Sequence, residues 1–198
     1  MGKQQTIASD KTIAVTVNGV SIYQSQIITQ KEYNQLSLET NTQQIDAESG
    51  LSDAEKESLK SQVLEQLTQT DQTILDNLIN NEVILQEAKN EGLMANSADA
   101  VSMANSNYYG LKAMDSQSYQ ALQDYMAANG LTESQYLDQS VKIYQDTITR
   151  QNLYQKFIQT LPDTDTSDQI QSAWNNYVDE LVQKANIVYY NTVSSTSS

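Results

Sequence analysis

The residues whose spacing most suggests chemistry are two aspartates, Asp163 and Asp165, in the segment PDTDT. Carboxylates at this spacing occur in calcium loops, but an EF-hand also needs a central glycine and a terminal glutamate, which this segment lacks. The chain contains no histidine and no cysteine, so the usual groups for proton transfer at neutral pH and for thiol chemistry are missing. We therefore expect a helix-capping acidic linker here, no cofactor, no metal site and no enzyme activity.

A second group of residues suits binding. The chain has 12 tyrosines but one phenylalanine, and segment 97–129 gathers several tyrosines and methionines. Tyrosine joins an apolar ring to a polar hydroxyl and methionine adapts to irregular shapes, so both suit surfaces that bind varied partners. The same residues also suit a helical core, and core and groove remain two alternatives. For a groove between 97–129 and 132–160, the candidate peptide-binding residues are Tyr108, Tyr109, Met114, Tyr125 and Tyr144.

Helix start signals recur along the chain and indicate which elements position these residues. Ser or Thr followed three residues later by Glu or Gln is the capping box, in which two side chains satisfy unpaired backbone N–H groups. The pattern occurs at Ser21–Gln24, Ser52–Glu55, Thr132–Gln135 and Thr166–Gln169. With glycines as stop signals, it predicts a loop over 41–49 and helices over 22–40, 52–69, 71–91, 97–113, 116–129, 132–160 and 167–184.

The helix over 71–91 carries two apolar stripes side by side. Ile74, Leu78, Leu85 and Ala88 form one, and Leu75, Ile79 and Val83 form the other. Such a wide apolar arc predicts contact with neighbours on more than one side. We expect this helix to be central and rigid.

Short strand-like segments stand near both ends of the chain, IAVTV at 13–17 and NIVYY at 186–190. Both are rich in β-branched or aromatic residues, and both are too short to be stable alone. We predict that they pair with each other as a small β clamp, with Trp174 buried beside them. The alternative is a hairpin of 13–17 with VSIY through Asn18–Gly19, and we prefer the clamp because Ser21–Gln24 has the pattern of a helix start.

Composition excludes several partners. The 11 basic and 25 acidic side chains give a net charge of −14. A surface of this sign repels phosphate backbones and anionic lipids, so we expect no nucleic-acid binding and no polybasic membrane attachment. We expect a flexible N-terminal tether over 1–11, one helical domain over 12–192 (an N-terminal part at 12–160, a closing helix and strand at 166–192) and a flexible tail over 193–198.

Three stretches resemble the SurA/PrsA-type N-terminal domain family of extracytoplasmic chaperones and foldases. Val17–Ile22, VNGVSI, resembles its V-N-G-x-x-I opening, and the segment 75–93 is similar to its L-x-x-L-I-x-x-x-L-L-x-Q-E-A-K-x-x-G-L helix. Trp174–Tyr189 resembles its closing W-x-x-x-L-x-x-x-A-x-I helix and strand. The resemblance implies a mainly α, multi-helix SurA N-terminal-like domain with a small β clamp.

The chain departs from many family members between the last two helices. Those members insert a parvulin prolyl isomerase domain there, whereas here only Leu161–Thr166 separates the helices, and the histidines of parvulin sites are absent. The resemblance thus implies an extracytoplasmic chaperone for unfolded or exported polypeptides without isomerase activity, on the cell surface or anchored as a bacterial lipoprotein through a lipid site upstream. The alternative is a structural or adaptor module of the cell envelope with one specific protein partner.

Overall fold

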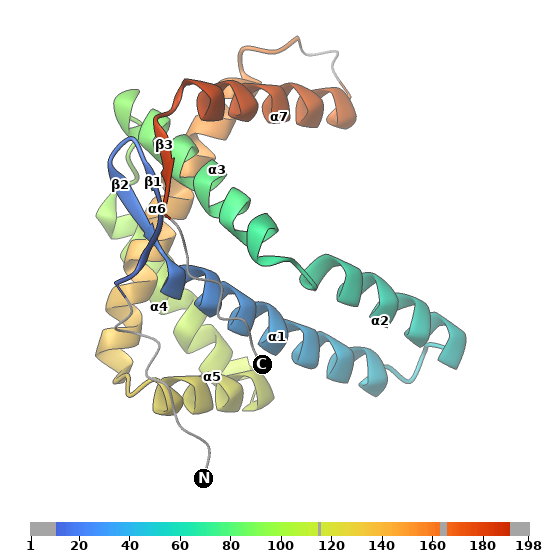
Figure 1. Ribbon diagram of the computed structural model, residues 1–198. Helices are drawn as coiled ribbons and strands as arrows, with labels where there is room; N and C mark the ends of the chain where they lie inside the picture. Colours follow the sequence, from blue (N-terminus) through green and yellow to red (C-terminus); the bar gives the residue numbers. More distant parts are fainter. Residues whose placement is uncertain (1–10, 115, 163–165, 191–198) are drawn as a thin grey trace, which may run out of the picture. The chain divides into compact units, whose positions relative to one another are not determined.

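The computed structural model describes residues 11–114, 116–162 and 166–190, and it confirms a mainly α fold with a small sheet (Figure 1). The elements in chain order are β1 (Ile13–Val17), β2 (Val20–Tyr23), α1 (Gln24–Ala47), α2 (Asp53–Leu67), α3 (Asp71–Asn90), α4 (Ser97–Met114), α5 (Ser116–Ala128), α6 (Glu133–Ile158), α7 (Ser167–Lys184) and β3 (Ile187–Tyr189).

The described residues fall into two units. The first runs to Ile79 and resumes at Asn186, and the second is Asn80–Ala185, so the boundary lies within α3 and again after α7. The single domain expected over 12–192 stays a prediction. Apart from Lys11, the expected tether over 1–11 lies outside the described residues, as do the tail over 193–198 and the pair Asp163 and Asp165.

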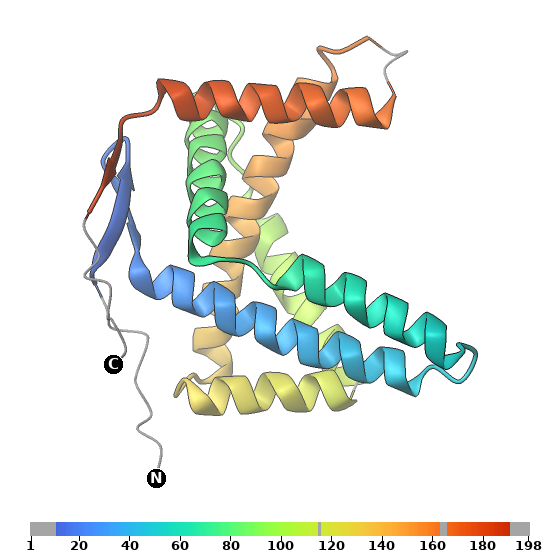
Figure 2. The same cartoon turned by 45° about the vertical axis from the view of Figure 1, so that its right-hand side comes forward.

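The predicted clamp between the chain ends is confirmed in the first unit, where β1 pairs antiparallel with β3 (Figure 2). Val15 lies opposite Tyr189, and Val17 lies opposite Ile187. Asn18 extends the pairing, because its N–H donates to the Asn186 carbonyl at 2.9 Å and its side-chain oxygen accepts from the Asn186 N–H at 2.8 Å. Segments at opposite ends of the sequence therefore stabilise one sheet.

The hairpin was wrongly set aside as an alternative, because it forms together with the clamp and the sheet order is β2-β1-β3. Asn18 and Gly19 have positive φ values of 50° and 85°, as expected for a tight hairpin turn. In the strand that pairs with β1, Ile22 is only 3% exposed. This burial, together with the strand pairing, favours VSIY as a strand over a helix start. Helix α1 begins later, and Gln26 accepts the N–H of its N-cap residue Tyr23 at 2.8 Å.

The predicted loop over 41–49 was also wrong, because α1 continues to Ala47. The polar segment is held in helix by its packing against α2, where Lys60 pairs with Asp46 at 2.6 Å and the Lys56 ammonium donates to the Asp46 carbonyl at 2.8 Å. The three remaining capping boxes are confirmed at the N-termini of α2, α6 and α7, with Ser52, Thr132 and Thr166 as N-cap residues.

Helix α3 buries the predicted stripes on both sides of the unit boundary. In the first unit, Ile74 packs with Ala14 and Ile27, and Leu75 and Leu78 lie against them. In the second unit, the buried residues of α3 are Val83, Ile84, Leu85 and Ala88.

The predicted burial of Trp174 was wrong, since its side chain is only half-buried. Its ring centroid lies 5.0 Å from that of Tyr154 and 5.3 Å from that of Phe157, both on α6. Helix α7 is strongly amphipathic, and its Tyr177 ring also stacks on Phe157. The large ring therefore belongs to an aromatic cluster between α6 and α7 rather than to a closed core.

Candidate binding site between α4, α5 and α6

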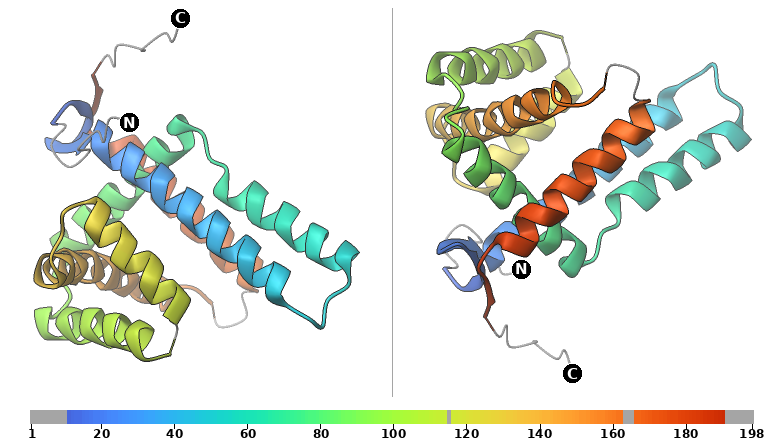
Figure 3. Two further views of the ribbon diagram at one scale, coloured as in Figure 1. Left: turned by 90° about the horizontal axis from the view of Figure 1, so that it is seen from below. Right: turned by 90° about the horizontal axis from the view of Figure 1, so that it is seen from above.

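The candidate site lies in the second unit, on the antiparallel pair of helices α4 and α6 with α5 beside α4 (Figure 3). Small buried side chains, Ala100 and Ala104 on α4 and Ser140 on α6, let the two helices approach closely. Just before α4 the Ala95 N–H donates to the Thr149 hydroxyl at 2.9 Å. Further along, the Asn107 amide donates to the Tyr144 hydroxyl at 2.6 Å. These bonds set the register of the pair.

A pocket of about 430 Å³ opens between the three helices. Its volume lies within the range of known small-ligand sites, roughly 300–1,000 Å³. The walls combine tyrosine rings and leucines with a few hydroxyl and amide groups, and the lining residues are Ala104, Ser106, Asn107, Tyr108, Gly110, Leu111, Leu122, Tyr136, Ser140 and Tyr144. None of these side chains is charged, so the pocket suits apolar or aromatic groups and neutral hydrogen-bonding partners.

Tyr108 is the centre of an aromatic cluster at one end of this pocket and is only 3% exposed. Its ring centroid lies 5.2 Å from that of Tyr109 and 5.9 Å from those of Tyr119 and Tyr136. The first two contacts are edge-to-face, an arrangement that aromatic rings favour. Tyr108 therefore packs as a core residue while one part of it lines the pocket.

One carboxylate organises the hydroxyl groups of the cluster. Glu133 accepts from the Tyr108 hydroxyl at 2.9 Å through Oε2 and from the Tyr109 hydroxyl at 3.1 Å through Oε1. Burial raises the pKa of Tyr108 well above its ordinary value, and its hydrogen bonds with Tyr119 and Glu133 raise it further. The bond to Glu133 is also the main cause of the raised pKa of Tyr109. Both phenols are held in their neutral, donating form.

The structure brings together some of the five sequence candidates. Tyr108 and Tyr144 line the pocket, whereas Tyr109, which is 49% exposed, and the half-buried Tyr125 are not among the lining residues. The side chain of Met114 lies outside the described part of the chain. Peptide binding by these residues stays a prediction.

Tyr136 lines the pocket but was not among the residues predicted from the sequence, although a signal for it existed. Tyr136, Ser140 and Tyr144 are four residues apart along α6, so they share one face of the helix. That face is the wall that α6 contributes to the pocket. The spacing could have indicated this wall, but not which helices stand opposite it.

Within 11–114, 116–162 and 166–190, no group of three or more His, Cys, Asp or Glu side chains could hold a metal ion. Over the same ranges, every helix is too short or too polar to cross a membrane.

Comparison with known proteins identifies one family. A model described as the SurA-like N-terminal domain matches residues 1–153, which include all residues that line the pocket. No curated protein and no solved structure shows a significant match to the chain.

Proposed function

The chain belongs to the SurA-like N-terminal domain family, and we propose that it is an extracytoplasmic chaperone that binds unfolded or exported polypeptides without prolyl isomerase activity. Domains of this family are associated with polypeptide binding in chaperone roles and are generally extracytoplasmic. Attachment to a membrane through a lipid anchor upstream is part of the same proposal. Metabolic labelling of the expressed precursor with a radioactive fatty acid would test the anchor.

The pocket between α4, α5 and α6 is the observation that supports binding. The rings of Tyr108, Tyr136 and Tyr144 offer apolar surface that does not select one side-chain shape. The exposed Ser106 hydroxyl and the side-chain carbonyl of Asn107, whose amide nitrogen already donates to Tyr144, lie beside them, and such groups can exchange hydrogen bonds with the backbone of any extended segment. Ring burial and hydrogen bonds to the peptide backbone do not depend on one particular side chain, so they suit reversible binding of varied polypeptides.

The absence of isomerase activity is proposed from the junction between α6 and α7. Helix α6 ends at Ile158 and α7 begins at Ser167, whereas a folded domain needs at least about 50 residues. We expect the protein to leave the cis–trans exchange of a proline-containing peptide at its slow uncatalysed rate, tens to hundreds of seconds. Acceleration in proportion to protein concentration would contradict this part of the proposal.

Gly110 offers a sharp test of the pocket. It lines the pocket within α4, and a Cβ atom built on it meets nothing within 4 Å. Gly110→Leu should therefore fill the pocket without a clash, and loss of a helical glycine favours the helix by up to about 1 kcal/mol. We expect the wild type to suppress aggregation of several unrelated unfolded proteins, and the variant to lose most of this activity while remaining folded.

Ala113→Leu is the matched control, because Ala113 is exposed on the same helix and does not line the pocket. This variant should protect clients as the wild type does. If the wild type protects none of the unrelated clients, the chaperone proposal fails and the adaptor module with one specific partner takes its place. If Gly110→Leu protects as well as the wild type, binding occurs elsewhere on the molecule.

A further inference from the structure

A second hollow lies along α4 and α6 and is lined by a different set of residues. Its volume is about 510 Å³, and its lining residues are Val101 and Asn105 from α4 and Glu133, Ser134, Leu137, Asp138 and Val141 from α6. The first pocket and this second hollow share no lining residue. The second hollow is also charged, whereas the first pocket is neutral.

The second hollow combines an apolar floor with acidic sides. Val101 is 42% exposed, and Leu137 and Val141 are half-buried, so each offers apolar surface that a bound side chain would cover. Glu133 and Asp138 are both exposed carboxylates, and none of the lining residues is basic. Two lysines lie nearby: Lys142 on α6 is 3.9 Å from the carboxylate of Asp146, and the ammonium of Lys112 on α4 lies over the Tyr119 ring, 5.7 Å from its centroid.

Glu133 is held in place by two neutral hydrogen-bond donors. It is the first residue of α6, where the helix dipole favours a negative side chain. Its two oxygens accept from the hydroxyls of Tyr108 and Tyr109, and neither donor carries a positive charge. The position of the carboxylate is thus defined before any ligand arrives, which lowers the ordering cost of binding a cation.

We propose that the second hollow selects polypeptide segments in which an apolar residue is flanked by lysine or arginine. The apolar residue packs on Val101, Leu137 and Val141, and the flanking cations pair with Glu133 and Asp138. The net charge of −14 attracts such segments over longer range. It also disfavours a second copy of this chain as the occupant, since two copies repel. This inference rests on the proposed chaperone function and specifies its preferred clients.

The test compares three fluorescent peptides that share an extended apolar core and carry lysine, glutamine or glutamate on both sides. Binding to the full chain is measured by fluorescence anisotropy at low and at high salt. We expect the lysine peptide to bind about three- to tenfold more tightly than the glutamine peptide, as two partly exposed ion pairs would give, and the glutamate peptide to bind most weakly. High salt should remove most of the difference.

Asp138→Lys is the decisive variant. Asp138 is exposed, and reversing the charge at this position should move the binding preference from the lysine peptide toward the glutamate peptide. Glu133→Gln together with Asp138→Asn should abolish the preference. Asp124→Asn together with Asp179→Asn is the matched control, since both residues are exposed on other helices of the same unit. The control changes the net charge equally and should keep the preference.

The outcomes separate this inference from the chaperone proposal. If all three peptides bind the wild type equally at low salt, the charge preference is wrong while peptide binding stands. A preference lost equally in the control pair would assign it to net charge and overturn the site. If no peptide binds, the proposed function fails and this inference with it. Self-association that Asp138→Lys alters, seen by sedimentation, would make a second copy the occupant.

Discussion

The two antiparallel helix pairs, α1–α2 in the first unit and α4–α6 in the second, differ in what they bury. In α1 the buried residues are Ile27 and Asn34, and α2 has none. Helix α4 buries Ala100, Ala104 and Tyr108, and α6 buries Ser140, Thr149 and Leu153. The two pairs therefore bury different sets of side chains, and α4–α6 buries more of them than α1–α2 although the helices are of similar length.

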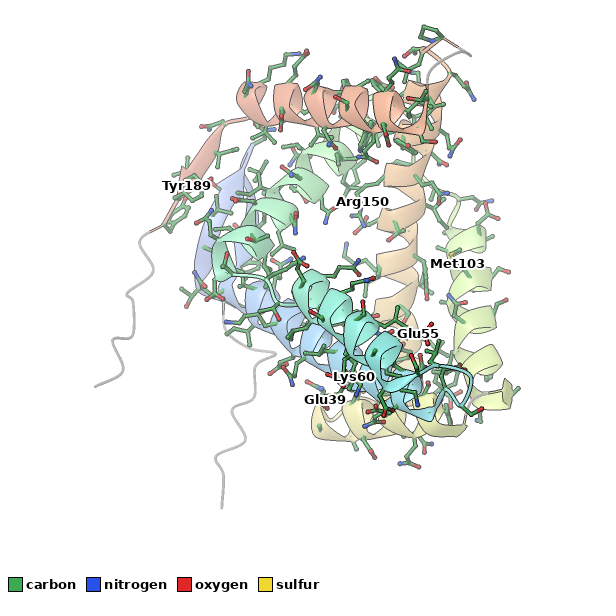
Figure 4. All side chains as sticks on the ribbon, turned by 90° about the vertical axis from the view of Figure 1, so that its right-hand side faces the viewer. Glu39, Glu55, Lys60, Met103, Arg150 and Tyr189 are labelled. Atoms are coloured by element: carbon green, nitrogen blue, oxygen red, sulfur yellow. The ribbon has the colours of Figure 1, made fainter. Side chains whose placement is uncertain are left out.

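Polar contacts do not make up this difference in α1–α2. The ion pair between the two helices joins Lys60 on α2, which is labelled in Figure 4, to Asp46 on α1 at 2.6 Å. Such partly exposed pairs contribute little to stability, because solvent screens their charges. The α4–α6 pair gains burial and bonds between helices, such as that from Asn107 to Tyr144. We infer that α1–α2 is the weaker pair and opens more readily.

The largest expected change in the free energy of unfolding comes from replacing a buried leucine of the α4–α6 pair, which we compare with an exposed leucine of the α1–α2 pair. Leu153 on α6 is 2% exposed, whereas Leu64 on α2 is 50% exposed. Leu153→Ala should lower the free energy of unfolding by about 2–4 kcal/mol, because it leaves a cavity, and Leu64→Ala should change it by less than about 0.5 kcal/mol. Urea unfolding followed by circular dichroism measures both. Equal losses in the two variants would contradict the comparison.

An intermediate loss of stability is expected when Tyr108 is replaced, because its hydroxyl links α4 to Glu133 of α6. Tyr108→Phe should cost about 0.5–1.5 kcal/mol, the usual contribution of a hydrogen bond. The matched variant Tyr109→Phe removes a bond from an exposed residue and should cost less. Urea unfolding at neutral pH ranks the two.

The raised pKa of Tyr108 adds a pH signature to the same variant. Above pH 10, its ordinary pKa, the unfolded chain loses this proton while the folded chain keeps it. Wild-type stability should therefore fall as the pH rises from 10 through the folded pKa, and Tyr108→Phe should weaken that fall. Stability curves from pH 8 to 12 test this, and parallel curves would contradict the buried, neutral state of Tyr108.

The smallest loss of stability is expected from substitution of the capping residue at the N-terminus of α2. Ser52 and Glu55 form a capping box, and Ser52→Ala should cost this helix about 0.5–1 kcal/mol. Ser58→Ala, at an exposed position of the same helix, should instead be neutral or slightly stabilising. Amide hydrogen exchange in α2 measures both. If both variants exchange alike, the cap does not stabilise the weaker pair.

The capping box also makes α2 sensitive to acid. The hydrogen bond from the Ser52 side chain, followed by that from its backbone N–H, lowers the pKa of Glu55 below 4.5. This stabilisation is present above pH 4.5 and is lost as the pH falls through the folded value. Ser52→Ala should reduce the acid dependence of exchange in α2. An unchanged dependence would show that another carboxylate governs it.

Local signals predicted much of the fold correctly. The capping boxes at Ser52, Thr132 and Thr166 act within one helical turn, so the start of each of these helices could be predicted from four residues. The stripes of α3 follow from helical periodicity, and the segments at 13–17 and 186–190 follow from their β-branched and aromatic residues. For the candidate site, the tyrosine-rich segment and Tyr108 and Tyr144 could be identified.

The sequence by itself determined the helical class, the acidic surface, most helix starts and the two terminal strands, because each depends on neighbouring residues or on composition. Tertiary structure decided the rest. VSIY became β2 because β1 offered it a partner, and α1 extended to Ala47 because α2 lies against it. Glu133 became the acceptor for tyrosines 24 and 25 residues earlier. Such contacts join residues far apart in sequence, and no local pattern encodes which helices meet.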